Sequence, residues 1–70
     1  MNYFIINVPG KHGYSFMVCG EFADEYDAIE HAANAELFDD VDDIDYAFAD
    51  GLVTEQDIKH FKSYGCCYTC

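Results

Sequence analysis

The chain has no arginine and no tryptophan, and its three lysines leave the whole stretch between residues 21 and 57 without a positive charge. Three lysines against 14 acidic residues disfavour direct binding to nucleic acid or to an anionic membrane surface, because both carry the sign of the chain. No run of about 18 apolar residues is present, so we expect no transmembrane helix. Residues 1–8 lack a basic flank and a small-residue cleavage site, which predicts a cytoplasmic protein without a signal peptide.

Cysteines are few and unevenly placed, with Cys19 in the first third of the chain and Cys66, Cys67 and Cys70 at its end. A secreted disulfide framework spreads its cysteines, so we expect reduced thiols, with a bond from Cys19 to the tail as an alternative in an oxidised preparation. The tail has one C-x-x-C pair and lacks the second pair that structural zinc sites commonly use. Cys66, Cys67 and Cys70 are therefore weak metal candidates, and we expect no metal and no cofactor.

Signatures of catalysis are missing as well. No catalytic motif surrounds the four cysteines or the three histidines. The Asp-rich stretch fails as a calcium loop, since the fifth position counted from Asp40 is Ile44 and the sixth is Asp45. We therefore expect a protein that is not an enzyme.

The 70 residues are 51% hydrophobic, which is enough for a single folded α+β domain over residues 1–70. Residues 3–8 and 14–19 are rich in aromatic and β-branched side chains and flank a loop with Pro and Gly, a pattern typical of a β-hairpin. Alternation gives this hairpin one apolar face, ready to be covered by a helix and formed by Phe4, Ile6, Val8, Tyr14, Phe16 and Val18.

A first helix is predicted over residues 23–37, with Asp24 as its N-cap. Its expected inward stripe consists of Tyr26, Ile29, Ala33 and Leu37. The alanines beside that stripe, Ala28, Ala32 and Ala35, permit a close approach to the sheet.

The second half of the chain contains two further predicted elements. Residues 39–50 fit both a helix and a strand, and we favour a short helix that ends at Gly51. A last helix is predicted from Thr54, where the sequence is close to a capping box, with Ile58, Phe61 and Tyr64 inward. The predicted fold is thus an N-terminal antiparallel hairpin packed against two or three helices, with a third strand from the C-terminal tail as an option.

All 14 acidic residues lie between Glu21 and Asp57, and eleven of them fall between Glu21 and Asp45. Apolar residues at helical spacing interleave them, which indicates a folded acidic surface rather than a disordered tail. On one continuous helix these carboxylates would recur about every 3.4 Å, close to the phosphate spacing along a strand of B-DNA. The sequence therefore predicts an acidic surface that can engage a row of lysine and arginine residues built for a phosphate backbone.

In size, in charge and in its mixed strand and helix pattern, the chain resembles small phage-encoded inhibitors of bacterial defence, including anti-CRISPR proteins and antirestriction DNA mimics. The resemblance implies action in the cytoplasm of a bacterial host. The implied partner is a basic nucleic-acid-binding protein, such as a CRISPR effector or a restriction enzyme, which is blocked sterically and electrostatically. The residues that the resemblance implies for this contact are Asp24, Glu25, Asp27, Glu30, Asp39, Asp40, Asp42, Asp43 and Asp45. Two alternatives stay open: an interaction or adaptor domain whose charge only keeps it soluble, and a zinc-stabilised module built on the cysteine tail.

Overall fold

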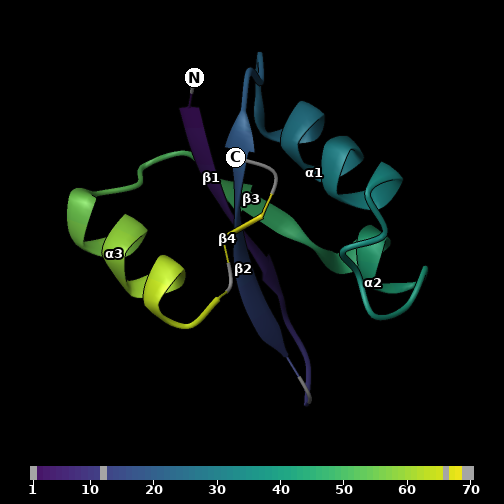
Figure 1. Cartoon of the computed structure of the whole chain (residues 1–70). Coiled ribbons are helices and arrows are strands. Elements are labelled where there is room, and N and C mark those ends of the chain that lie inside the picture. The colour runs from purple at the N-terminus through teal and green to yellow at the C-terminus, as the bar shows by residue number, and fades with distance from the viewer. Residues whose placement is uncertain (1, 12, 66, 69–70) are drawn as a thin grey trace.

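The computed structural model describes residues 2–11, 13–65 and 67–68, and it combines a four-stranded sheet with three helices (Figure 1). The strands are β1 (Asn2–Val8), β2 (Tyr14–Gly20), β3 (Phe48–Asp50) and β4 (Cys67–Tyr68), in the spatial order β3-β1-β2-β4. β1 pairs antiparallel with β2 and with β3, and β4 lies parallel to β2. The helices are α1 (Glu25–Asn34), α2 (Asp43–Tyr46) and α3 (Glu55–Ser63). The predicted α+β class with an N-terminal hairpin is confirmed.

The hairpin presents the apolar face that alternation predicts. Ile6 pairs with Phe16, and both are buried in the main core together with Val18. Alternation does not predict how deeply the opposite face of β2 is buried, where Met17 and Cys19 are 0% and 1% exposed. β2 is therefore covered on both faces and lies at the centre of the molecule.

α1 begins at the predicted N-cap, where the Asp24 carboxylate accepts a hydrogen bond from the backbone N–H of Asp27 at 3.0 Å. The helix packs on the sheet through Ala28 and Ala32, which are fully buried. The predicted stripe is wrong at Tyr26, which is 72% exposed. Because the small alanines allow the helix backbone close to the strands, the alanine side of α1 faces inward and the larger tyrosine is left outside.

Residues 39–50 contain both of the structures that their pattern allows. α2 confirms a short helix within this stretch. The prediction that the helix continues to Gly51 is wrong, because residues 48–50 form the strand β3. In β3, Ala49 pairs with Ile6 of β1 and is only 7% exposed, so burial outweighs the weak strand propensity of alanine. Gly51 does not cap a helix; it follows β3 at a point where a Cβ atom would lie 2.9 Å from the Phe4 ring.

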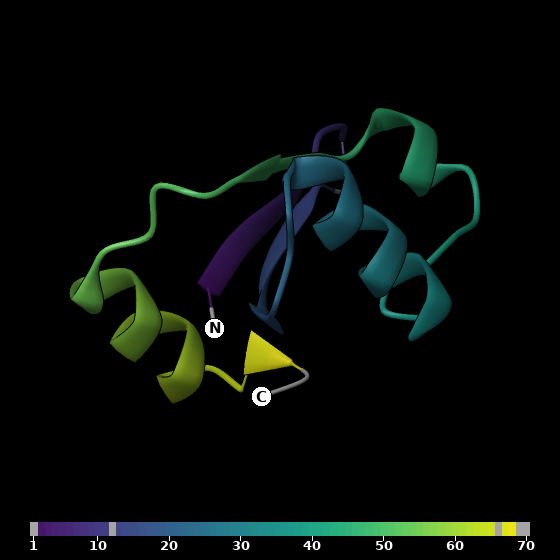
Figure 2. The ribbon, with the colours of Figure 1, turned by 90° about the horizontal axis from the view of Figure 1, so that it is seen from above.

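α3 lies on the opposite side of the sheet from α1 and α2 (Figure 2). It begins with the predicted capping box, in which the Thr54 hydroxyl and the Asp57 carboxylate each accept a backbone N–H of the other residue at 3.2 Å. The prediction that Tyr64 faces inward is wrong, because α3 ends at Ser63 and leaves Tyr64 73% exposed. Within the described residues, none of the helices has the length and apolar composition that crossing a bilayer requires.

Candidate functional site

α1, α2 and the connection between them lie on one side of the sheet, and these helices and the connections that lead into them are rich in carboxylates (Figure 1). All are exposed except Asp43, which is half-buried, and neither helix contains a lysine. These helices and connections carry the nine acidic residues predicted from the sequence, and Glu36 lies in the same part of the chain. We call this set the acidic surface, which consists of Asp24, Glu25, Asp27, Glu30, Glu36, Asp39, Asp40, Asp42, Asp43 and Asp45.

Tyr14 of β2 connects the sheet to the acidic segment at residues 39–43 through two hydrogen bonds. Its hydroxyl donates to the Asp43 carboxylate at 2.8 Å and accepts from the backbone N–H of Asp39 at 2.9 Å. Burial of the hydroxyl is the main cause that raises the pKa of Tyr14 above its ordinary value of 10.0, and the hydrogen bond to Asp43 adds to it. The tyrosine therefore stays protonated at neutral pH and holds the loop in place.

Four of the nine predicted carboxylates make hydrogen bonds within the chain and so help to shape the acidic surface. Asp24 caps α1, and Asp27 accepts from the backbone N–H of Ala23 at 3.0 Å. Asp40 accepts from the backbone N–H of Asp42 at 3.1 Å, and Asp43 accepts from Tyr14. Within the described part of the chain, the other five carboxylates have no hydrogen-bond partner and are available to another molecule: Glu25, Glu30, Asp39, Asp42 and Asp45.

A shallow hollow lies between the end of α1 and the loop that leads into α2. It combines three carboxylates with four apolar side chains, and its lining consists of Ala33, Glu36, Phe38, Asp39, Asp40, Val41 and Ile44. One of the apolar residues, Val41, is 78% exposed. This combination suits the side chain of arginine or lysine, since the aliphatic stem packs on apolar atoms while the cationic head pairs with carboxylates.

Glu36 has a backbone conformation that is rare for a residue with a side chain. Its φ is 57°, and it follows α1 in a Schellman motif in which Glu36 donates to Ala33 at 3.1 Å and Leu37 donates to Ala32 at 3.0 Å. Glycine usually occupies this position because it has no Cβ to clash. Glu36 is not among the nine site residues predicted from the sequence, although its place off the inward stripe of the predicted helix indicates exposure to water.

The cysteines differ from the reduced thiols expected from the sequence. Cys19 is buried and disulfide-bonded, so the expectation of reduced thiols is wrong for this residue. The pairing of Val18 with Tyr68 explains the difference, because it brings the C-terminal segment beside β2. The metal candidates Cys66 and Cys70 lie outside the described residues, and for Cys67 only the backbone is described. In the part of the chain that the structure describes, no group of three or more His, Cys, Asp or Glu residues is placed to hold a metal ion.

The acidic surface therefore combines exposed carboxylates, an absence of lysine on its helices and a hollow with an apolar lining. These are properties of a surface that binds cationic side chains of another molecule. Comparison of the chain with protein-family models, with curated proteins and with solved structures finds no match.

Proposed function

We propose that the chain binds a basic nucleic-acid-binding protein through the acidic surface and occupies the place that nucleic acid would take. The observation that carries this proposal is that α1 and α2, which contain carboxylates and no lysine, lie on the same side of the sheet (Figure 2). Ordinary protein surfaces intersperse both signs of charge. A surface of one sign produces a field that attracts a cluster of lysine and arginine residues.

The mechanism is exclusion and requires no chemistry. Asp27 and Glu30 are three residues apart on α1, a spacing at which side chains lie about 5–6 Å apart. Carboxylates spaced in this way can each pair with a cation that otherwise contacts a phosphate. The chain and nucleic acid then compete for the same cations, so bound chain blocks the site.

The partner class in this proposal is a CRISPR effector or a restriction enzyme, which makes the chain a phage-encoded inhibitor of bacterial defence. Support comes from the small size, the net charge of -11 and the mixed α+β pattern that the chain shares with such inhibitors. The net charge predicts fast, charge-steered association with a basic target.

A second candidate function is an interaction domain that binds through apolar contacts. Three large apolar side chains that follow α2 along the chain are exposed: Phe48 at 54%, Leu52 at 87% and Tyr64 at 73%. Affinity at such a patch would change little with salt. Binding through the acidic surface weakens steeply as added salt screens the charges, so salt dependence separates the two candidates.

The test begins with capture of partners from a bacterial lysate, followed by affinity measurements on the captured protein at low and high salt. The variant Asp42→Asn/Asp45→Asn removes two carboxylates that have no hydrogen-bond partner within the described residues. The matched control Asp50→Asn/Glu55→Gln removes the same charge outside α1, α2 and the connections that lead into them, and asparagine keeps an oxygen that can accept the hydrogen bond from the backbone N–H of Leu52. Asp40 and Asp43 are left unchanged because they hold the loop.

We expect the first variant to lose roughly tenfold in affinity and the control to lose little. An oligonucleotide that the partner recognises should displace the chain. Equal losses in both variants, or an affinity that does not respond to salt, would refute the proposal and favour the apolar patch.

A further inference from the structure

β2 has two buried faces, and different parts of the chain lie against them. Phe16 and Val18 belong to the main core, which α1 covers. Met17 and Cys19 alternate with them along the strand, so they lie on the other face, on the side of the sheet where Figure 2 shows α3. Met17 and Cys19 are buried as deeply as the main core. We call the side of β2 that carries Met17 and Cys19 its second face.

The second face is covered by elements that make few noncovalent contacts of their own. Within α3, all of which the structure describes, no residue is buried, and its two apolar residues, Ile58 and Phe61, are partly buried. β4 pairs with β2 only opposite Met17 and Val18, whereas β1 pairs with β2 along the full length of the strand. The cover formed by α3 and β4 is therefore weakly held compared with the main core.

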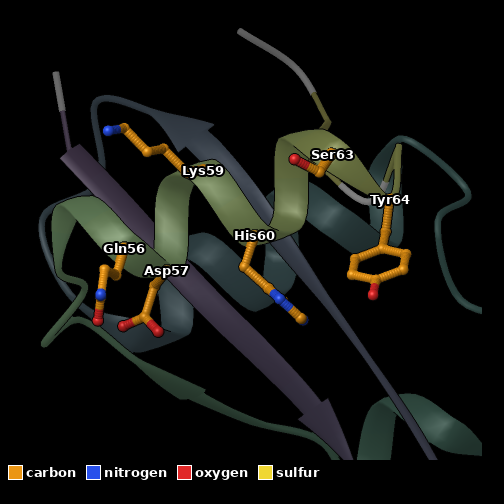
Figure 3. A pocket seen from close by; sticks show the side chains of 6 residues that line it. All are labelled: Gln56, Asp57, Lys59, His60, Ser63 and Tyr64. Carbon is orange, nitrogen blue, oxygen red and sulfur yellow. The ribbon is translucent and has the colours of Figure 1, made fainter.

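The last turn of α3 also leaves space beside β2. Ser15 of β2 and three aromatic residues, His60, Phe61 and Tyr64, line a hollow between the strand and the helix. Figure 3 shows the neighbouring hollow along α3, where His60 and Tyr64 project to the same side of the helix. Their ring centroids lie 4.8 Å apart. The helix thus packs on β2 less closely than α1 packs on the main core, where Ala32 is fully buried.

A disulfide joins this cover to β2. Cys19 is disulfide-bonded, and its partner is one of Cys66, Cys67 and Cys70, since the chain has no other cysteine. The bond therefore closes a covalent ring that runs from β2 to the C-terminal cysteines and contains α3. A cross-link that spans about 50 residues favours the closed chain roughly 1000-fold over an open one. Much of what holds α3 and β4 against the second face is thus covalent.

We propose that this disulfide is a redox switch that closes and opens the second face of β2. In the reduced state α3 and β4 leave β2, which uncovers Met17 and the Cys19 thiol. The main core keeps α1 in place, and α1 and α2 lie on the other side of the sheet from α3, so the acidic surface is common to both states (Figure 2). In the cytoplasmic location predicted from the sequence, disulfides are usually transient or redox-sensing rather than permanent.

The reductant in this proposal is a small thiol such as glutathione. Its thiolate attacks one sulfur of the disulfide, forms a mixed disulfide and displaces the other cysteine as a thiolate. A second molecule of the thiol then attacks the mixed disulfide and releases the remaining cysteine. Two molecules of the thiol leave as their own disulfide, and the two cysteines of the chain gain two electrons and two protons.

Hydrogen–deuterium exchange of the full chain, with and without reduced glutathione, tests the switch by location. The amides of both α1 and α3 should be protected in the oxidised chain. After reduction, the amides of α3 should exchange roughly 100-fold faster or more, because opening no longer works against the cross-link. The amides of α1 and β1 should stay protected. Oxidised glutathione should restore the protection of α3.

Alkylation with iodoacetamide under native conditions gives a second readout. The variant Cys66→Ser/Cys67→Ser/Cys70→Ser keeps Cys19 as its only thiol and cannot form the disulfide. Cys19 should react in this variant nearly as fast as an exposed thiol, because opening uncovers it. The matched variant Cys19→Ser also lacks the disulfide, and its α3 amides should exchange as fast as those of the reduced parent chain.

Peptide mapping of the oxidised chain identifies the partner of Cys19, and a bond to any of the three C-terminal cysteines of the same chain supports the proposal. Four results would overturn it: a disulfide that reduced glutathione leaves intact, an α3 that stays protected after reduction, a Cys19 thiol that stays unreactive in the serine variant, or a bond between two chains. Loss of protection in α1 together with α3 would also overturn it, because the disulfide would then hold the whole fold rather than one face.

Discussion

Glu36→Gly is expected to stabilise the chain, although it removes a residue of the acidic surface. The left-handed conformation at φ 57° costs an ordinary residue roughly 1–2 kcal/mol. Glycine avoids that cost but adds roughly 0.4–1 kcal/mol of chain entropy to the unfolded state. The difference is a gain of about 0.5–1 kcal/mol in the free energy of unfolding, equivalent to a rise in Tm of about 2–8 °C for a domain of this size.

Urea denaturation with linear extrapolation measures the change, and Glu36→Gln is its control. Glutamine keeps the Cβ and the backbone cost but removes the negative charge beside Asp39 and Asp40. The stability of the glutamine variant thus reports the relief of charge repulsion alone. If the glycine variant is no more stable than the glutamine variant, the backbone at Glu36 is not strained and the reasoning fails.

The same two variants connect this strain to function. Both lose one of the three carboxylates in the hollow between α1 and α2, so both should bind the partner more weakly. Stability and binding would then move in opposite directions in the glycine variant. That result is expected of a residue that is retained for binding at a cost in stability.

Two further predictions concern the packing around the acidic surface. Tyr14→Phe should cost about 1 kcal/mol at neutral pH, because the bonds to Asp39 and Asp43 are lost. The pKa of Tyr14 is raised above its ordinary value of 10.0 in the folded chain. The protonated hydroxyl therefore stabilises the fold fully below pH 10.0, and this contribution is lost as the pH rises through the pKa of the folded state. Urea unfolding at neutral pH and above pH 10 should therefore show an alkaline loss of stability that is smaller in the Phe variant. Ala32→Leu should destabilise the chain by roughly 1–3 kcal/mol, because Ala32 is fully buried between α1 and the sheet. Circular dichroism during thermal melting tests this, and an unchanged Tm would show that the helix does not approach the sheet closely.

Features that depend on neighbouring residues were predictable from the sequence. The N-cap at Asp24 and the capping box of Thr54 and Asp57 involve residues three positions apart, so the local pattern contains all the information they need. The hairpin is also local, because its two strands adjoin a short loop. The composition of the acidic surface was readable for the same reason, since α1 and α2 follow each other along the chain.

Features that depend on distant segments were not predictable. β3 forms because Ala49 fits beside Ile6, which lies far away in the sequence, and no local preference of alanine indicates a strand there. The inward side of α1 was misassigned at Tyr26 because the sheet, and not the helix alone, selects which residues fit between them. The disulfide at Cys19 was only an alternative in the sequence analysis, because the choice between a thiol and a disulfide depends on where β4 pairs.

The sequence by itself determined the charge of this protein, its class of fold and the starts of its longer helices, because these follow from composition and from contacts within a few residues. Only the tertiary structure decided which side of the sheet each helix covers, and hence that α1 and α2, with their acidic residues, lie on one side while α3, with its lysines, lies on the other. The physical reason is that helix placement follows from burial against strands that are remote in the chain, and that burial cannot be read from either segment alone.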